Sequence, residues 1–134
     1  MTPDMNAAVS SAIDSLRKCF PESVVMVEPD GAGGARVAVE TVSLSGHYKQ
    51  SETWIAGHLV AQLPYADIYP LFVRGDLTRS DGRSLGSGLS SGQMFLGRSA
   101  VQVSRRSNRR DPAIETAAHK FMKVIEWLRH HPGT

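Results

Sequence analysis

The sequence predicts a single α+β domain over residues 1–134, with a helix at each end and antiparallel strands between them. Two observations indicate this class. Apolar residues recur with the helical period of about 3.6 near both ends of the chain. The middle holds short valine- and isoleucine-rich runs separated by glycine, serine, proline and aspartate, a pattern typical of strands joined by turns. A chain of 134 residues buries enough surface to fold without disulfides.

The first predicted element is a helix over residues 6–19. Val9, Ile13 and Leu16 recur at helical spacing and share one face. Pro21 ends the helix, because proline cannot continue the helical hydrogen-bond pattern. We expect this apolar face to pack on the sheet.

A hairpin is predicted next. Residues 23–28, "SVVMVE", are a short strand, and "PDGAGG" at 29–34 has the composition of a turn. Residues 36–42 alternate, so the second strand is expected to place Val37, Val39 and Thr41 on one side.

Residues 54–63 are predicted to form a third strand with a bend at Gly57. Pro70 lacks a backbone donor, so residues 68–73 are placed at a sheet edge or in an extended arm. Residues 75–93 hold five glycines and five serines, which predicts a long mobile loop, and residues 94–104 return as a last strand. The antiparallel meander therefore has three to four strands.

The C-terminal helix has the clearest signals. Asp111 is expected at the N-cap and Pro112 at the first helical position. The residues expected on its apolar face are Ile114, Ala118, Phe121, Ile125 and Leu128.

The chain has an ordinary composition and a net charge of +2. This charge is too small for its surface as a whole to bind polyanions. Its lone cysteine, Cys19, excludes an internal disulfide and indicates a reducing compartment. No apolar run approaches the ~20 residues that span a bilayer. We expect a cytoplasmic protein that makes no membrane contact.

Basic charge is concentrated in one part of the chain. Residues 74–110 carry eight arginines and two aspartates, and Arg105, Arg106, Arg109 and Arg110 lie within "SRRSNRRD". Such a cluster could bind nucleic acid. No aromatic residue for base stacking occurs in 96–120, however, and arginines before a helix are commonly solvated or paired with acids. Nucleic-acid binding stays as the alternative function.

Reactive side chains give no catalytic site. Ser90 lies in a G-x-S-x-G match, but its polar, glycine-rich context lacks the strand-to-helix turn of a nucleophile elbow. Cys19 faces the negative end of its helix, which disfavours the thiolate. The five histidines lack metal-ligand spacing, and His58 is expected to be a packed or hydrogen-bonded ring. No catalytic residue, metal or cofactor is expected, and a diverged enzyme using Ser90 or Cys19 remains an open alternative.

The order of elements resembles the ubiquitin-conjugating fold and its non-catalytic relatives, the RWD-type domains. Tyr69-Pro70 corresponds to the Tyr-Pro of the family's flap, although the proline pair that follows it there is missing. Pro112 takes the proline place of the family's Trp-x-Pro, and counting back aligns Val101-Gln102-Val103 with its Ile-Cys-Leu run. The family's His-Pro-Asn is also missing.

The resemblance implies a conjugating frame without its nucleophile, because glutamine cannot form a thioester. It implies a catalytically inactive bacterial protein, a pseudoenzyme that binds a protein partner. That partner would be a ubiquitin-like modifier, an activating enzyme or a conjugating subunit. The residues expected to contact it are Gln102, Arg105, Arg106, Arg109, Arg110, Tyr69 and Pro70.

Overall fold

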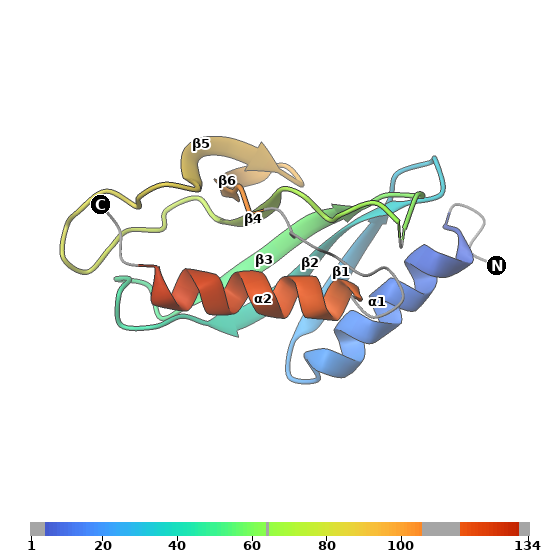
Figure 1. Ribbon diagram of the computed structural model, residues 1–134, viewed down its shortest axis with the longest axis horizontal. Helices are drawn as coiled ribbons and strands as arrows, with labels where there is room; N and C mark the ends of the chain where they lie inside the picture. Colours follow the sequence, from blue (N-terminus) through green and yellow to red (C-terminus); the bar gives the residue numbers. More distant parts are fainter. Residues whose placement is uncertain (1–4, 64, 106–115, 132–134) are drawn as a thin grey trace.

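The computed structural model describes residues 5–63, 65–105 and 116–131. These residues form two helices and six strands (Figure 1). In chain order the elements are α1 (Ala7–Cys19), β1 (Val24–Pro29), β2 (Ala35–Ser43), β3 (Glu52–Leu59), β4 (Leu71–Arg74), β5 (Leu89–Phe95), β6 (Arg98–Val103) and α2 (Ala117–His130). The predicted α+β class is confirmed, whereas the described strands outnumber the three to four expected from the sequence.

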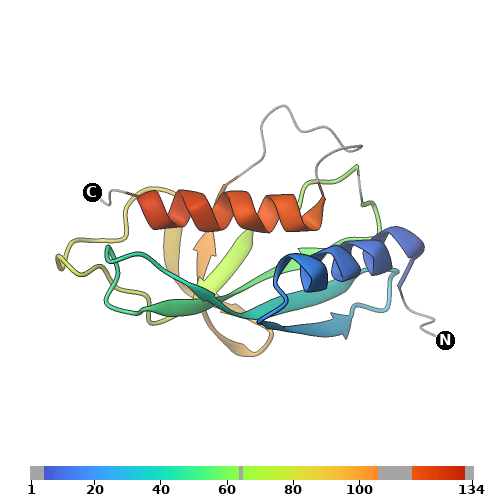
Figure 2. The ribbon, with the colours of Figure 1, turned by 90° about the horizontal axis from the view of Figure 1, so that it is seen from below.

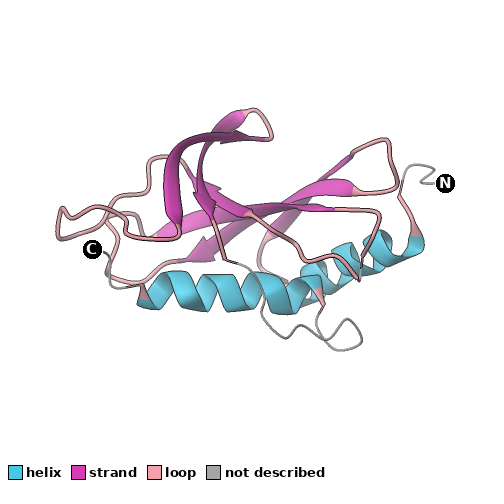
Figure 3. Ribbon diagram, turned by 45° about the horizontal axis from the view of Figure 1, so that its top comes forward, coloured by secondary structure: helices cyan, strands magenta, loops and turns pink. Residues whose placement is uncertain are grey.

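The strands form one antiparallel sheet in the order β1-β2-β3-β4-β6-β5. The first four are neighbours in chain order and make a meander. The β5–β6 hairpin joins this meander through β6, which pairs with β4. Figure 3 shows this hairpin curling away from the side on which the helices lie.

Both helices lie on one face of the sheet (Figure 2). We call it the covered face; one row of its residues is Val39, Ile55, Val73 and Val101, which lie in register on four strands and in the core. The other side is the open face, where Met26, Ala38, Ala56, Phe72, Gln102 and Ser90 form a row across all six strands. The core thus lies between the helices and the covered face.

Helix α1 forms as the sequence predicts. The Asn6 side chain caps it, accepting a hydrogen bond of 2.9 Å from the Val9 backbone N–H. Val9, Ile13 and Leu16 are buried, so the predicted apolar face is the one that packs. Asn6 Nδ2 also donates to the Ala61 carbonyl at 2.8 Å, which ties the start of α1 to the segment after β3.

Helix α2 begins later than predicted. Its N-cap is Thr116, whose hydroxyl accepts from the His119 backbone N–H, while the His119 ring accepts from the Thr116 N–H. The prediction of Asp111 as N-cap of this helix is therefore wrong; Asp111, Pro112 and Ile114 lie outside the described residues. The remaining residues of the predicted face, Ala118, Phe121, Ile125 and Leu128, are buried. Neither described helix combines the length and the apolar character that crossing a bilayer requires.

The alternation predicted for β2 fails at one end. The β2–β3 register shifts between Val39 and Val42, and beyond the shift Val42 is buried while Thr41 is exposed. A bulge adds one residue to a strand, which moves the following side chains to the other face. The prediction that Thr41 lies on the same side as Val37 and Val39 is wrong for this reason.

The segment around Pro70 is not at a sheet edge. Strand β4 begins at Leu71 and lies between β3 and β6. Pro70 comes directly before the strand, so its missing N–H removes no bond from the ladder. The buried side chains of Leu71 and Val73 hold this short strand in the centre of the sheet.

Residues 75–93 are only partly a loop. Leu77 and Arg79 are 4% and 2% exposed, and residues 89–93 belong to β5. The predicted last strand over 94–104 is divided, because β5 and β6 meet at a turn at Leu96 and Gly97. Sequence composition missed β5, since its serines, glycine and glutamine bury little apolar surface.

Candidate protein-binding site

The start of β4 and the end of β6 meet at one end of the sheet. Leu71 pairs with Val103 in the antiparallel register, so Tyr69 and Pro70, which precede β4, lie beside the residues that follow β6. Arg105 is among those residues and is exposed. Three of the predicted contact residues are thereby brought to the same region.

A buried lysine of α2 holds this region in place. Lys120 of α2 is 3% exposed, and its Nζ donates to the Arg105 carbonyl at 2.7 Å. The same Nζ lies 3.2 Å and 3.3 Å from the two carboxylate oxygens of Asp67. Lys120 therefore joins α2, the end of β6 and the segment before β4. A buried charge requires such pairing, because desolvation disfavours an isolated ion.

Lys120 was not among the residues singled out from the sequence. It lies next to Phe121 on the buried side of α2, whose other buried members are Ala117, Ala118, Val124, Ile125 and Leu128. A lysine at an apolar position of an amphipathic helix is the one signal that could have identified it. The sequence alone could not have named Asp67 as its partner.

The Arg105 side chain turns toward α2. Its guanidinium lies 5.6 Å from the centroid of the Trp127 ring, within cation–π range. Its carbonyl is held by Lys120, so the backbone at this point is anchored while the charged end stays exposed. Arg106, Arg109 and Arg110 lie outside the described residues.

Gln102 does not join this group. Its neighbours in β6, Val101 and Val103, are buried in the core, so the Gln102 side chain points to the open face. There it lies between Phe72 of β4 and Ser90 of β5, and its Nε2 donates to the Ser104 hydroxyl at 3.1 Å. Gln102 and the Arg105 guanidinium are therefore on different sides of the sheet.

The tip of the β5–β6 hairpin covers part of the open face. The Phe95 ring stacks on Phe72 with centroids 4.5 Å apart. Arg98 lies over the Trp54 ring, 4.2 Å from its centroid, and forms an ion pair with Glu40. These contacts explain why Ala38, Ala56 and Ala100 are fully buried although the helices lie on the other face.

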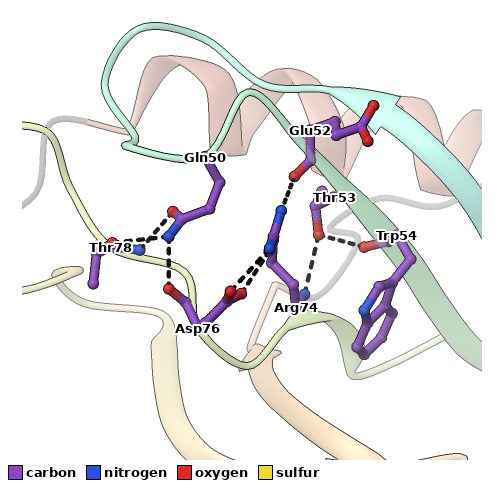
Figure 4. A network of polar contacts seen from close by, with 7 residues as sticks. All are labelled: Gln50, Glu52, Thr53, Trp54, Arg74, Asp76 and Thr78. Atoms are coloured by element: carbon purple, nitrogen blue, oxygen red, sulfur yellow. Dashed lines mark hydrogen bonds and ion pairs between the residues drawn. The ribbon is translucent and has the colours of Figure 1, made fainter.

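A polar network joins the loop before β3 to the end of β4 (Figure 4). Arg74 grips the Asp76 carboxylate through Nε and one terminal nitrogen, at 2.5 and 2.9 Å, and donates to the Glu52 carbonyl. The hydrogen bond from Arg74 lowers the pKa of Asp76, and the same bond raises the pKa of Arg74. Gln50 Nε2 donates to the Asp76 carbonyl and the Thr78 hydroxyl, and Gln50 Oε1 accepts from the Thr78 N–H.

A hollow of about 490 Å³ lies beside this network. Its lining includes both Arg74 and Arg98, a pair that would suit an anion if their charges were available. Each is already neutralised, Arg74 by Asp76 and Arg98 by Glu40. The hollow therefore has the chemistry of a structural network and not of an anion site.

Arg79 serves the end of α2. It donates to the His131 carbonyl at 2.9 Å, while Tyr48 and Ser45 donate to the Leu128 and Arg129 carbonyls at 2.6 and 2.8 Å. Burial raises the pKa of Tyr48. The last carbonyls of a helix have no partner within the helix, so these side chains bond groups at the end of α2, of which the Leu128 carbonyl also accepts from the His131 N–H.

The other sequence candidates find structural roles or none. Ser90 lies within a strand, away from any strand-to-helix turn, and Cys19 is the exposed last residue of α1. His58 is hydrogen-bonded as expected, with Nε2 2.6 Å from Asp30 Oδ2. Within the described residues, no group of three or more His, Cys, Asp or Glu side chains could hold a metal ion.

Comparison with protein-family models, with curated proteins and with solved structures finds no match to this chain.

Proposed function

We propose that this chain is a non-catalytic, protein-binding member of the ubiquitin-conjugating-like fold, acting in a bacterial ubiquitin-like modification system. Its partner would be the modifier, the activating enzyme or a conjugating subunit. Two features support the resemblance in fold: the meander β1 to β4 follows the N-terminal helix α1 in the chain, and Tyr69-Pro70 comes directly before β4.

Gln102 carries the non-catalytic part of the proposal. The position that the resemblance assigns to the nucleophile holds an amide, whose nitrogen is a poor nucleophile. Gln102 lies on the open face, whereas the chain's lone cysteine, Cys19, lies on α1, which packs against the opposite face. No thiol of this chain is placed to substitute for the missing one.

Arg105 and its surroundings carry the binding part. Arg105 is exposed, and its backbone carbonyl is hydrogen-bonded to Lys120. The positive charge of Arg105 is therefore accessible while its backbone position is fixed. Tyr69 and Pro70 lie beside it. Such an arrangement suits an acidic protein surface, because complementary charges favour association and specify orientation.

The described arginines give little support to the nucleic-acid alternative. Arg74 and Arg98 are paired with carboxylates, and Arg79 is 2% exposed. A phosphate-binding surface needs several arginines whose charge is free to replace counterions. We therefore propose no second function.

The test is a charging assay with the activating enzyme and ubiquitin-like protein of the same cell, run with and without reductant. We expect no reductant-sensitive adduct on this chain. An adduct that disappears in Cys19→Ser would overturn the non-catalytic proposal.

A binding titration tests the site. Arg105→Glu should weaken association with the partner and reduce its dependence on salt, because attraction to an acidic surface is lost. Arg83→Glu is the matched control, since Arg83 is also an exposed arginine, lying on the segment between β4 and β5. Equal effects of the two variants would contradict the placement of the site. Absence of binding to modifier, activating enzyme and conjugating subunit alike would overturn the function.

A further inference from the structure

Strand β1 forms an edge of the sheet whose usual protection is confined to one proline, Pro29, at its last position. It pairs with β2 through six consecutive residue pairs with no register shift, and the described residues supply no strand on its other side. Val24 and Met26 are 66% and 52% exposed on the open face. Exposed edges are normally blunted by bulges, prolines, lysines or inward-pointing charges, because their free backbone groups bind other strands; residues 24–28 of β1 contain neither a proline nor a lysine.

The opposite edge of the sheet shows this protection. Strand β5 has a register shift between Ser90 and Gln93, and its exposed residues include Ser91 and Gly92. A bulge interrupts the regular spacing of donors and acceptors that an added strand needs. Both edges carry exposed apolar side chains, since Met94 of β5 is 66% exposed, but only β1 combines them with a ladder free of a register shift.

A hollow of about 380 Å³ lies on the open face beside β1. Met26 and Glu28 of β1 line it on one side, and Leu96 and Arg98 of the hairpin line it on the other. Alternate residues of a strand point to the same face, so a strand added to β1 would turn every second side chain to the open face, where it would contact Met26 at the rim of this hollow. The site thus offers backbone pairing and a place for side chains, the two parts of recognition by strand addition.

Charge argues against a second copy of this chain as the added strand. Antiparallel self-pairing that places Met26 opposite Met26 puts Val24 opposite Glu28, an apolar group against a carboxylate. Moving the register by two residues toward the N-terminus puts Glu22 directly opposite Glu28. Like charges directly opposite each other destabilise a strand pair.

The same two carboxylates favour a basic segment. Glu22 precedes β1 and Glu28 lies near its end, and both are exposed. The nearest opposite charge across the ladder, Arg36, belongs to β2 and so lies on the side away from the free edge. A lysine or arginine in the added strand would meet Glu28 first.

We propose that the free edge of β1 binds an extended segment of a partner protein by strand addition. The segment has apolar residues at alternate positions, which contact Val24 and Met26, and a lysine or arginine beside Glu28. This surface is separate from the one around Arg105, so the proposal stands independently of the function proposed above.

The experiment uses the whole chain and a short synthetic peptide of alternating threonine and valine, with one valine replaced by lysine and a fluorescent label at one end. We expect saturable binding by fluorescence anisotropy, and slowed amide exchange in residues 24–28 when the peptide is added. A peptide with glutamate in place of the lysine should bind about tenfold more weakly, and Glu28→Lys should reverse the preference.

Two matched variants separate the edges. Met26→Lys places a charge on the β1 edge and should abolish binding, whereas Ser91→Lys places the same charge on β5 and should leave binding intact. Both positions are exposed, so both variants should fold, which a circular-dichroism melt verifies. Failure of the lysine peptide to bind, or loss of binding only in Ser91→Lys, would overturn the proposal. A dimer in sedimentation velocity that Met26→Lys dissociates would also overturn it and assign the edge to a second copy.

Discussion

At the scale of single residues, two side-chain pairs fix segments that lie outside the strands and helices. Lys120 and Asp67 connect α2 to the segment before β4, and Asp30 and His58 connect the β1–β2 turn to β3. Asp30 Oδ1 also accepts the N–H groups of Ala32 and Gly34 at 2.7 and 3.0 Å. Both pairs therefore connect segments that are distant in the sequence, and mutation can test each of them.

Replacement of Lys120 by methionine should destabilise the protein by about 3–5 kcal/mol, because it removes the cation from a buried pair. The free energy of unfolding would be measured by urea denaturation. The control is the double variant Lys120→Met with Asp67→Asn, which removes both charges and should recover part of the loss. If the double variant is as unstable as the sum of the two single variants, the pair is not coupled as the distances indicate.

The stability of the protein should fall in acid through Asp30. The hydrogen bond from His58 is the largest cause that lowers the pKa of Asp30, from 3.8 to about 2, and the Ala32 and Gly34 N–H groups add to it. A pKa lowered by folding means that the native state favours the carboxylate. Its contribution is complete above about pH 4 and is lost as the pH falls through about 2. Chemical denaturation at several pH values should show a smaller decline over this range in Asp30→Asn than in the wild type.

At the scale of elements, the packing of β4 between β3 and β6 depends on a close approach at its end. Gly75 follows β4, and a Cβ added there would lie 2.6 Å from the Ser99 carbonyl carbon of β6. Backbone cannot yield as a flexible side chain does. The glycine is required here by the proximity of the next strand and not by a turn.

Gly75→Ala should therefore cost about 1–3 kcal/mol, the range for overpacking a tight site. Gly46→Ala is the matched control, since a Cβ there would meet nothing within 4 Å. Thermal denaturation of the two variants beside the wild type measures the difference. Equal melting temperatures would show that β4 and β6 separate easily at this point.

At the scale of the whole molecule, one core connects all layers. Phe121 and Ile125 of α2, Leu16 of α1 and residues of β2, β3, β4 and β6 belong to a single buried cluster. A protein with one such core unfolds as a unit. The two tryptophans give a way to test this, because Trp127 lies on α2 and Trp54 lies under Arg98 on the open face.

Single-tryptophan variants, Trp54→Phe and Trp127→Phe, should each give the same unfolding midpoint by fluorescence and by far-ultraviolet circular dichroism. Trp127 then reports the helical layer and Trp54 the face that the β5–β6 hairpin covers. A lower fluorescence midpoint for the Trp54 signal alone would show that the hairpin opens before the rest of the protein.

Some of this structure is contained in short stretches of sequence. The capped helix α1, its buried residues Val9, Ile13 and Leu16, and the β1–β2 hairpin follow from local spacing and turn chemistry. These features depend on residues within a few positions of one another, so a single sequence determines them.

Other features depend on which segments meet, and only the tertiary structure decided them. Pro70 suggested an edge strand, but β6 returns to pair with β4 and makes it central. In the sequence, Lys120 interrupts an apolar helix face. In the structure, its charge is paired with Asp67 and it donates to the Arg105 carbonyl, and both partners are distant in the chain. Gln102 lies within β6 on the open face, whereas Arg105, beyond the end of β6, lies over the Trp127 ring of α2, a contact that depends on where that helix packs. The whole chain must fold before distant residues pair or a charge is buried. The attraction and hydrogen bonding that offset the cost of desolvation arise only once the partners are in contact.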